Sequence, residues 1–128
     1  MANKLSKLKL GVIGMSEGNG HPYSWSAIFN GFDREEMKNC PFPVIPKYLA
    51  QQNFPQDFLY DRATVTHIWT QDRELSKNIA LAALIPNICN TLEEMIASVD
   101  GVLLARDDAE NHAKYAIPFL EAGLPIYI

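Results

Sequence analysis

Residues 99–128 read VDGVLLARDDAENHAKYAIPFLEAGLPIYI, and this stretch decides the fold. An apolar run at 99–105 precedes the polar segment 106–112. A stretch with helical spacing follows, ends at Gly123 and leads into a second apolar run at 124–128. This order predicts a strand, a loop, a helix and a second, parallel strand. The polar segment then lies at the carboxyl edge of an open α/β sheet, which is where ligands bind.

The composition predicts a single soluble domain, 1–128. The chain is 48% hydrophobic and 20% charged, and its 128 residues allow one modest core. Because the chain ends on an apolar run that we expect to be a buried strand, we also expect it to be part of a larger protein.

The charge distribution argues against two classes of partner. The formal net charge is -4, without a Lys/Arg cluster, which speaks against general nucleic-acid binding. The most basic stretch, Lys4 to Lys9, is predicted to be a solvated end. No run approaches the roughly 18 apolar residues of a membrane span, and no secretory signal is present. We therefore expect a cytoplasmic protein with Cys40 and Cys89 as reduced thiols.

A glycine-rich turn at 14–20 follows a predicted strand at 9–14 and precedes a predicted helix at 24–32. A dinucleotide site needs such a turn, because the backbone must approach the pyrophosphate closely and amides at a helix start must meet its charge. We match Gly14, Ser16 and Gly18 to the glycines of the G-x-G-x-x-G pattern. Met15, which lies between them, is assigned to the same cofactor site.

The segment 35–62 interrupts the alternation of strands and helices. Prolines at 41, 43, 46 and 55 break it up, and its aromatic content argues against disorder. Long irregular segments in small domains are usually functional or disordered. We predict an irregular insertion with room for one helical turn around 48–52, packed on the edge of the sheet.

Strands and helices alternate again after the insertion. The sequence predicts a strand at 63–70, a helix at 72–84 and a brief strand at 87–89. Thr91 and Glu94 form a capping box at the start of a further helix. The fold class is therefore α/β, a Rossmann-like, doubly wound parallel sheet with helices on both faces and right-handed crossovers.

The ends of the second and fourth strands supply further cofactor candidates. Thr70 or Asp72 would accept hydrogen bonds from the adenosine ribose, although Asp72 serves equally well as the N-cap of the next helix. Ala105 and Arg106 would flank the adenosine or nicotinamide half. The planar fork of an arginine suits a phosphate or a carboxylate.

Three polar residues near this edge are candidates for substrate binding. His21 either faces the cleft or braces the glycine turn, and His112 is either a ligand-facing or a structural histidine. Asp107, with its neighbour Asp108, either binds sugar hydroxyls, or one of the two caps the following helix. No metal is expected, since no two His or Cys residues have ligand spacing. We do not expect a Ser-His-Asp hydrolase, although GMSEG at 14–18 matches the G-x-S-x-G pattern of its nucleophile turn.

The chain resembles the glucose–fructose oxidoreductase and inositol dehydrogenase (Gfo/Idh/MocA) family. The resemblance is carried by the first strand with its glycine turn, by VDGVLLA at 99–105, by His112, and by FLEAGLPIYI at 119–128. It implies the amino-terminal Rossmann domain of an oxidoreductase, with NAD or NADP as cofactor. In that family the last strand leads into an acidic-Lys-Pro motif whose Lys approaches the nicotinamide. That catalytic Lys, and the substrate domain, would lie beyond Ile128.

Two departures from the family pattern leave the choice between NAD and NADP open. The family usually has Thr-Pro where this chain has Arg106-Asp107, and the middle glycine of the turn is Ser16. The loop SEGNGHPYSW at 16–25 and CPFP at 40–43 are similar to a subgroup associated with bacterial surface-sugar biosynthesis.

The leading hypothesis is the NAD(P)-binding part of an oxidoreductase that acts on a sugar-like substrate and is inactive as this chain alone. The first alternative is a non-catalytic module of the same fold that binds a nucleotide or nucleotide sugar. A third interpretation is an interaction domain that docks through its aromatic insertion. The last strand is expected to favour self-association.

Overall fold

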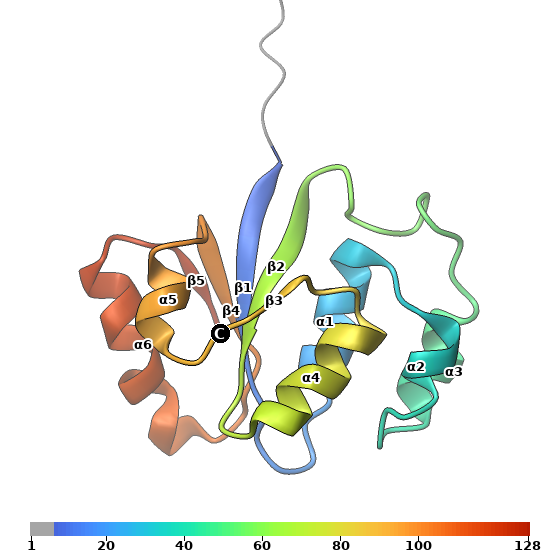
Figure 1. Ribbon diagram of the computed structural model, residues 1–128, viewed down its shortest axis with the longest axis horizontal. Helices are drawn as coiled ribbons and strands as arrows, with labels where there is room; N and C mark the ends of the chain where they lie inside the picture. Colours follow the sequence, from blue (N-terminus) through green and yellow to red (C-terminus); the bar gives the residue numbers. More distant parts are fainter. Residues whose placement is uncertain (1–6) are drawn as a thin grey trace, which may run out of the picture.

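The predicted strands form one parallel sheet with the order β3-β2-β1-β4-β5, and this confirms the Rossmann-like fold class. The computed structural model describes residues 7–128 (Figure 1). Residues 4–6 of the predicted solvated end lie outside them. The strands are β1 (Leu8–Ile13), β2 (Ala63–Trp69), β3 (Asn87–Ile88), β4 (Gly101–Leu104) and β5 (Ile126–Tyr127). The helices are α1 (His21–Asn30), α2 (Arg34–Met37), α3 (Val44–Leu49), α4 (Arg73–Ala82), α5 (Leu92–Ile96) and α6 (His112–Glu121), the last preceded by a 3₁₀ turn, Ala109–Asn111.

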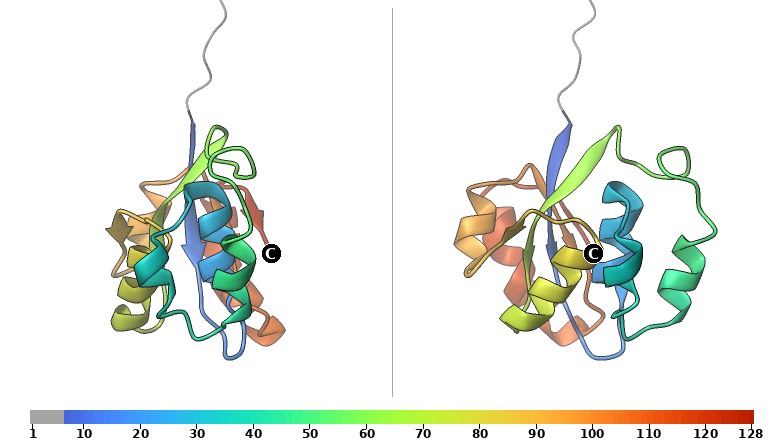
Figure 2. Two further views of the ribbon diagram at one scale, coloured as in Figure 1. Left: turned by 90° about the vertical axis from the view of Figure 1, so that its right-hand side faces the viewer. Right: turned by 45° about the vertical axis from the view of Figure 1, so that its right-hand side comes forward.

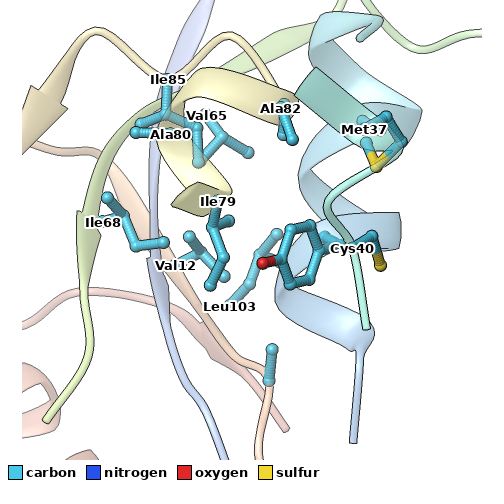
Figure 3. Packing of buried hydrophobic residues seen from close by; sticks show 14 of the residues in the cluster. Val12, Met37, Cys40, Val65, Ile68, Ile79, Ala80, Ala82, Ile85 and Leu103 are labelled. Atoms are coloured by element: carbon cyan, nitrogen blue, oxygen red, sulfur yellow. The ribbon is translucent and has the colours of Figure 1, made fainter. Parts of the chain in front are cut away.

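The helices cover both faces of the sheet. Helices α1 and α4 lie on one face, and α5 and α6 lie on the other (Figures 1 and 2). Alternate residues of the strands feed two cores, as the period of a strand requires. Val12 and Leu103 pack with α1 and α4, in the core drawn in Figure 3, whereas Ile13 and Leu104 pack with α5 and α6.

A bulge in β2 shifts this alternation by one residue. Leu10 pairs with Val65, but Gly11 pairs with His67, so Thr66 is an extra residue in β2. Val65 and Ile68 therefore enter the same core although they are three residues apart. Buried Asn30 completes the hydrogen bonding here, because its side chain accepts from the Val65 amide at 2.8 Å and donates to the Val65 carbonyl at 2.9 Å.

The insertion differs from the prediction in structure and in place. Instead of one turn around 48–52 it contains the helices α2 and α3, which form an outer layer beside α1 and α4 (Figure 1). Its backbone is tied to helices rather than to the sheet edge. The Asp33 amide donates to the Ala82 carbonyl at 2.9 Å, and the Leu59 amide donates to Ile28 at 2.8 Å. Met37 and Leu49 are buried and anchor the layer.

Two helix starts and the last strand also correct the sequence-based expectations. Helix α1 begins at His21 rather than at residue 24, because Pro22 in its first turn already has the φ of a helix. At α5 the Thr91 hydroxyl accepts from the Glu94 amide, but the Glu94 carboxylate accepts from Asn90, so the capping box is only half formed. The expected buried last strand is an edge strand, with Tyr127 63% exposed.

No helix within the described residues is long and apolar enough to cross a lipid bilayer.

Candidate functional site

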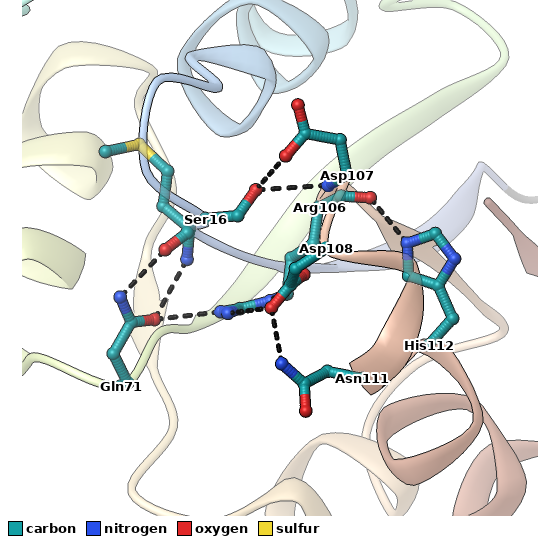
Figure 4. Close-up of polar contacts among 8 residues, drawn as sticks. Ser16, Gln71, Arg106, Asp107, Asp108, Asn111 and His112 are labelled. Carbon is teal, nitrogen blue, oxygen red and sulfur yellow. Dashed lines mark hydrogen bonds and ion pairs between the residues drawn. The ribbon is translucent and has the colours of Figure 1, made fainter.

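Three loops meet at the carboxyl edge of the sheet, and Figure 4 shows the polar contacts among them. The glycine-rich turn at 14–20 follows β1, residues 70–72 follow β2, and residues 105–111 follow β4. Because β1 lies between β2 and β4, the chain leaves β1 toward one side of the sheet and later returns on the other. This is the topological switch point at which open α/β sheets bind ligands.

The turn is tight and contains a required glycine. The Asn19 amide donates to the Ser16 carbonyl at 3.2 Å, and Gly18 has a φ of +76°, the left-handed conformation typical of the third residue of a type II turn. Counted from Gly14, the last position of the G-x-G-x-x-G pattern falls on Asn19, so Gly18 serves the turn rather than the pattern's third glycine. Within residues 7–128 the amides of Ser16, Glu17 and Gly18 donate to no protein acceptor.

The start of α1 packs directly against the turn. A Cβ on Gly14 would lie 2.3 Å from Cγ of Pro22, so only glycine allows this approach. The side chain of buried Asn19 accepts from the His21 amide at 2.9 Å and so holds the first turn of the helix. The turn is therefore a rigid part of the sheet edge.

Ser16 joins the turn to the loop after β4. Its hydroxyl donates to the Asp107 carboxylate at 2.6 Å and accepts from the Asp107 amide at 3.0 Å. Two residues that the sequence placed in neighbouring parts of one site are thus in direct contact. Ser16 is buried, whereas Asp107 is exposed.

Gln71 ties all three loops together, and sequence reasoning gave it no role. Its side chain accepts from the Met15 amide at 3.0 Å and donates to the Met15 carbonyl at 2.8 Å. The Arg106 guanidinium donates to the same Gln71 oxygen at 3.0 Å. Its position directly after β2, next to the turn across a parallel sheet, was the signal that could have identified it.

Arg106 and Asp108 form a bidentate ion pair at this edge. The two guanidinium–carboxylate distances are 2.9 and 2.7 Å, and Asn111 donates to the same carboxylate at 2.8 Å. The side chains are only 8% and 17% exposed, and the guanidinium lies 4.8 Å from the ring centre of Tyr115. The hydrogen bonds from Arg106 hold the pKa of Asp108 well below its usual range, and those to Asp108 raise the pKa of Arg106.

The two histidines of the predicted site point to different partners. Nε2 of His112 lies 2.8 Å from the Arg106 carbonyl, so this ring braces the loop after β4. His21 is exposed and stacks on Trp25, with ring centres 4.6 Å apart. Neither ring takes part in the contacts of Ser16 with Asp107.

Thr70, Asp72 and Ala105 hold the ends of their strands. The Thr70 hydroxyl pairs with that of Ser76 at 2.7 Å and donates to the Asp72 carbonyl at 2.6 Å. The Asp72 carboxylate accepts from the Glu74 amide at 2.9 Å, which makes it the N-cap of α4. Ala105 is buried, and its amide donates to Ile13 at 2.8 Å.

The remaining reactive side chains lie away from these loops or are buried. Cys40 and Cys89 are free, buried thiols, and burial raises the pKa of Cys89 to about 11. His67 lies in β2, where Nδ1 is 2.8 Å from the Thr66 hydroxyl and burial lowers its pKa. Among residues 7–128 no three His, Cys, Asp or Glu side chains are arranged to hold a metal ion.

Comparison with solved structures supports the fold. The chain is similar to UDP-N-acetylglucosamine 3-dehydrogenase GnnA from Acidithiobacillus ferrooxidans, with 14% identity, a TM-score of 0.58, and coverage of 97% of this chain and 30% of that one. GenD2 from gentamicin A biosynthesis, solved in complex with NAD, is 16% identical with a TM-score of 0.55. The match covers 98% of this chain and 27% of GenD2. An NAD binding oxidoreductase from Klebsiella pneumoniae is 16% identical with a TM-score of 0.56. The match covers 95% of this chain and 26% of that protein.

These likenesses establish a shared Rossmann-like fold. The chain spans less than a third of the length of each of these three proteins. No protein-family model and no curated protein sequence matches it.

Proposed function

We propose that this chain is the NAD(P)-binding domain of an oxidoreductase that acts on a sugar or nucleotide-sugar substrate. One observation carries the proposal, namely the glycine-rich turn at the switch point of the sheet, between β1 and α1. Its unpartnered amides at residues 16–18 suit the oxygens of a pyrophosphate. The space around Gly18 is open, since a Cβ there would meet no atom within 4 Å.

The other two loops at this edge would border the rest of a dinucleotide. The segment 70–72 would lie beside the adenosine ribose, and Ala105 with Arg106 would flank the adenosine or nicotinamide half. The nicotinamide supplies the hydride chemistry when bound, and the protein supplies position and electrostatics. The catalytic residue is expected beyond Ile128, so this chain alone is expected to bind without turning over a substrate.

The substrate class rests on two kinds of support. The fold is shared with a protein named as a UDP-N-acetylglucosamine dehydrogenase. The exposed Asp107 carboxylate at the crest after β4 suits the hydroxyls of a sugar, as do the imidazoles of His21 and His112, which border the same edge. All three residues are proposed as substrate contacts on this basis.

The test is a titration of the 128-residue chain with NADH and NADPH, followed through Trp69 and Trp25 fluorescence. Gly18→Ala and Gly123→Ala form a matched pair, because the two glycines have φ values of +76° and +78° and open surroundings. The two variants should lose similar stability, about 1 kcal/mol. Only Gly18→Ala should weaken binding, by about tenfold. The proposal is refuted if the folded chain shows no saturable change with either dinucleotide.

A non-catalytic nucleotide-binding module is the second candidate. This candidate is favoured because residues of the glycine turn already bind other residues of the chain. Gln71 binds both the amide and the carbonyl of Met15, and Asp107 binds Ser16. Such a module would bind ADP or a UDP-sugar as tightly as NADH. Tighter binding of NADH than of ADP supports the dinucleotide site instead.

A further inference from the structure

A small cavity lies where β2 and β3 end, and one of its lining residues is Gln71, which binds Met15 of the glycine turn. Its volume is about 220 Å³, and its lining includes Thr70, Arg73, Ser76 and Asn90. In a dinucleotide-binding sheet the end of the second strand is the place of the adenosine ribose. The side chains here therefore bear on the choice between NAD and NADP, which the sequence left open.

No carboxylate lines this cavity. The end of β2 has Thr70 at the place where an acid would bind the free ribose hydroxyls, and its hydroxyl is already paired with Ser76 at 2.7 Å. Two of the acids that lie near these residues in the sequence accept from backbone amides. Asp72 accepts from Glu74 at 2.9 Å, and Glu94 accepts from Asn90 at 3.0 Å.

Arg73 supplies a positive charge to the cavity. Its guanidinium donates to the Asn90 side chain, which places it across the gap between α4 and the end of β3. Arg73 takes part in no ion pair within residues 7–128. A cation in the first turn of a helix opposes the helix dipole, so the position of Arg73 is not explained by the stability of α4.

We propose that this cavity receives the 2′-phosphate of NADP(H), so that the domain prefers NADP(H) to NAD(H), with Arg73 as the residue that determines the preference. The inference rests on the proposed function, since it concerns the same dinucleotide. An arginine fork pairs well with phosphate oxygens, and Asn90 adds an amide donor beside it. A site without a carboxylate has no group to repel the phosphate and none to favour a free 2′-hydroxyl.

The experiment compares dissociation constants for NADPH and NADH in the wild-type chain, in Arg73→Gln and in Arg62→Gln. Arg62 is an exposed arginine directly before β2, at the opposite edge of the sheet, and controls for the loss of one charge. Wild type should bind NADPH at least tenfold more tightly than NADH. Arg73→Gln should weaken NADPH binding about tenfold and change NADH binding less than twofold, while Arg62→Gln should change neither.

Two results would overturn the inference, and a third would overturn the function with it. Equal or tighter binding of NADH by wild type shows that the cavity does not select a phosphate. If Arg73→Gln weakens the binding of both dinucleotides equally, Arg73 contributes to dinucleotide binding in general and does not select the phosphate. If a folded chain binds neither dinucleotide, the proposed function itself is wrong. A circular dichroism melt of each variant shows whether a loss of binding reflects a loss of structure.

Discussion

Replacement of Asp108 by Asn tests whether the ion pair with Arg106 holds the loop after β4. The pair is nearly buried, at 8% and 17% side-chain exposure, and its two distances are 2.9 and 2.7 Å. Asn keeps the shape but removes the negative charge and one acceptor oxygen. Hydrogen bonds to charged groups contribute about 1.5–3 kcal/mol each, so we expect Asp108→Asn to cost about 2 kcal/mol. For a domain of this length that corresponds to a fall in Tm of about 8 °C.

An exposed ion pair provides the control. Lys38 and Glu35 lie 3.0 Å apart with side chains 68% and 81% exposed. Exposed pairs contribute about 0.2–1 kcal/mol, and Glu35→Gln should therefore lower the free energy of unfolding by less than about 0.5 kcal/mol. Urea denaturation of wild type and both variants measures the difference. Equal losses in the two variants would show that the burial of Asp108 has no energetic consequence.

The pH dependence of the same difference gives an independent check. Arg106 holds the pKa of Asp108 well below its usual range, so the charged form stabilises the native state. That stability is fully present above the unfolded pKa of about 3.9 and is lost as the pH falls through the lower folded pKa. The difference in the free energy of unfolding between wild type and Asp108→Asn should stay constant from pH 7 to pH 5 and shrink below about pH 4. A gap as large at pH 3 as at pH 7 would contradict this explanation.

Three further outcomes test other parts of the fold. Gly14→Ala places a Cβ 2.3 Å from Pro22 and should lower stability by about 2 kcal/mol in a thermal melt, whereas an unchanged Tm would mean that the turn can move away. Asn30→Ala leaves the amide and carbonyl of Val65 without their side-chain partners and should cost about 3 kcal/mol in urea. Burial raises the pKa of Cys89 to about 11, so at pH 8 a thiol reagent should modify it only in denaturant. Rapid modification of the native chain would show that its strand end is open.

The fold was largely predictable because its signals are local. Apolar runs bounded by turn residues located all five strands, and helical spacing located the helices that cover the sheet. Helix α3 of the insertion was only partly predicted, as one turn around 48–52, because prolines fall at 43 and 46 and we interpreted them as breaks. Proline is compatible with the first turn of a helix, and there Pro43 caps α3 and Pro46 lies near its start.

The candidate site was predictable as a place but not as a set of contacts. The sequence put Ser16, Arg106 and Asp107 at one sheet edge because parallel strands end together. The bonds of Gln71 to Met15 follow from the lateral order of β2 and β1 in the fold, so only the fold class, and not a local pattern, could have indicated them. The ion pair of Asp108 with Arg106 was not predicted either, because the position of Asp108 in the sequence is equally compatible with a role as a helix cap.

The place of the insertion indicates that it supports the glycine turn. A Cβ on Gly20 would lie 2.5 Å from Ile45 and 2.6 Å from Phe42, so side chains from the start of α3 pack directly on the end of the turn. Helix α3 also packs on α1, which begins at the next residue. Because the end of the turn and the helix that follows it both contact the inserted segment, that segment restricts how the turn can move. A preorganised turn loses less freedom on binding an anion, and this gives the insertion a physical role in the proposed site.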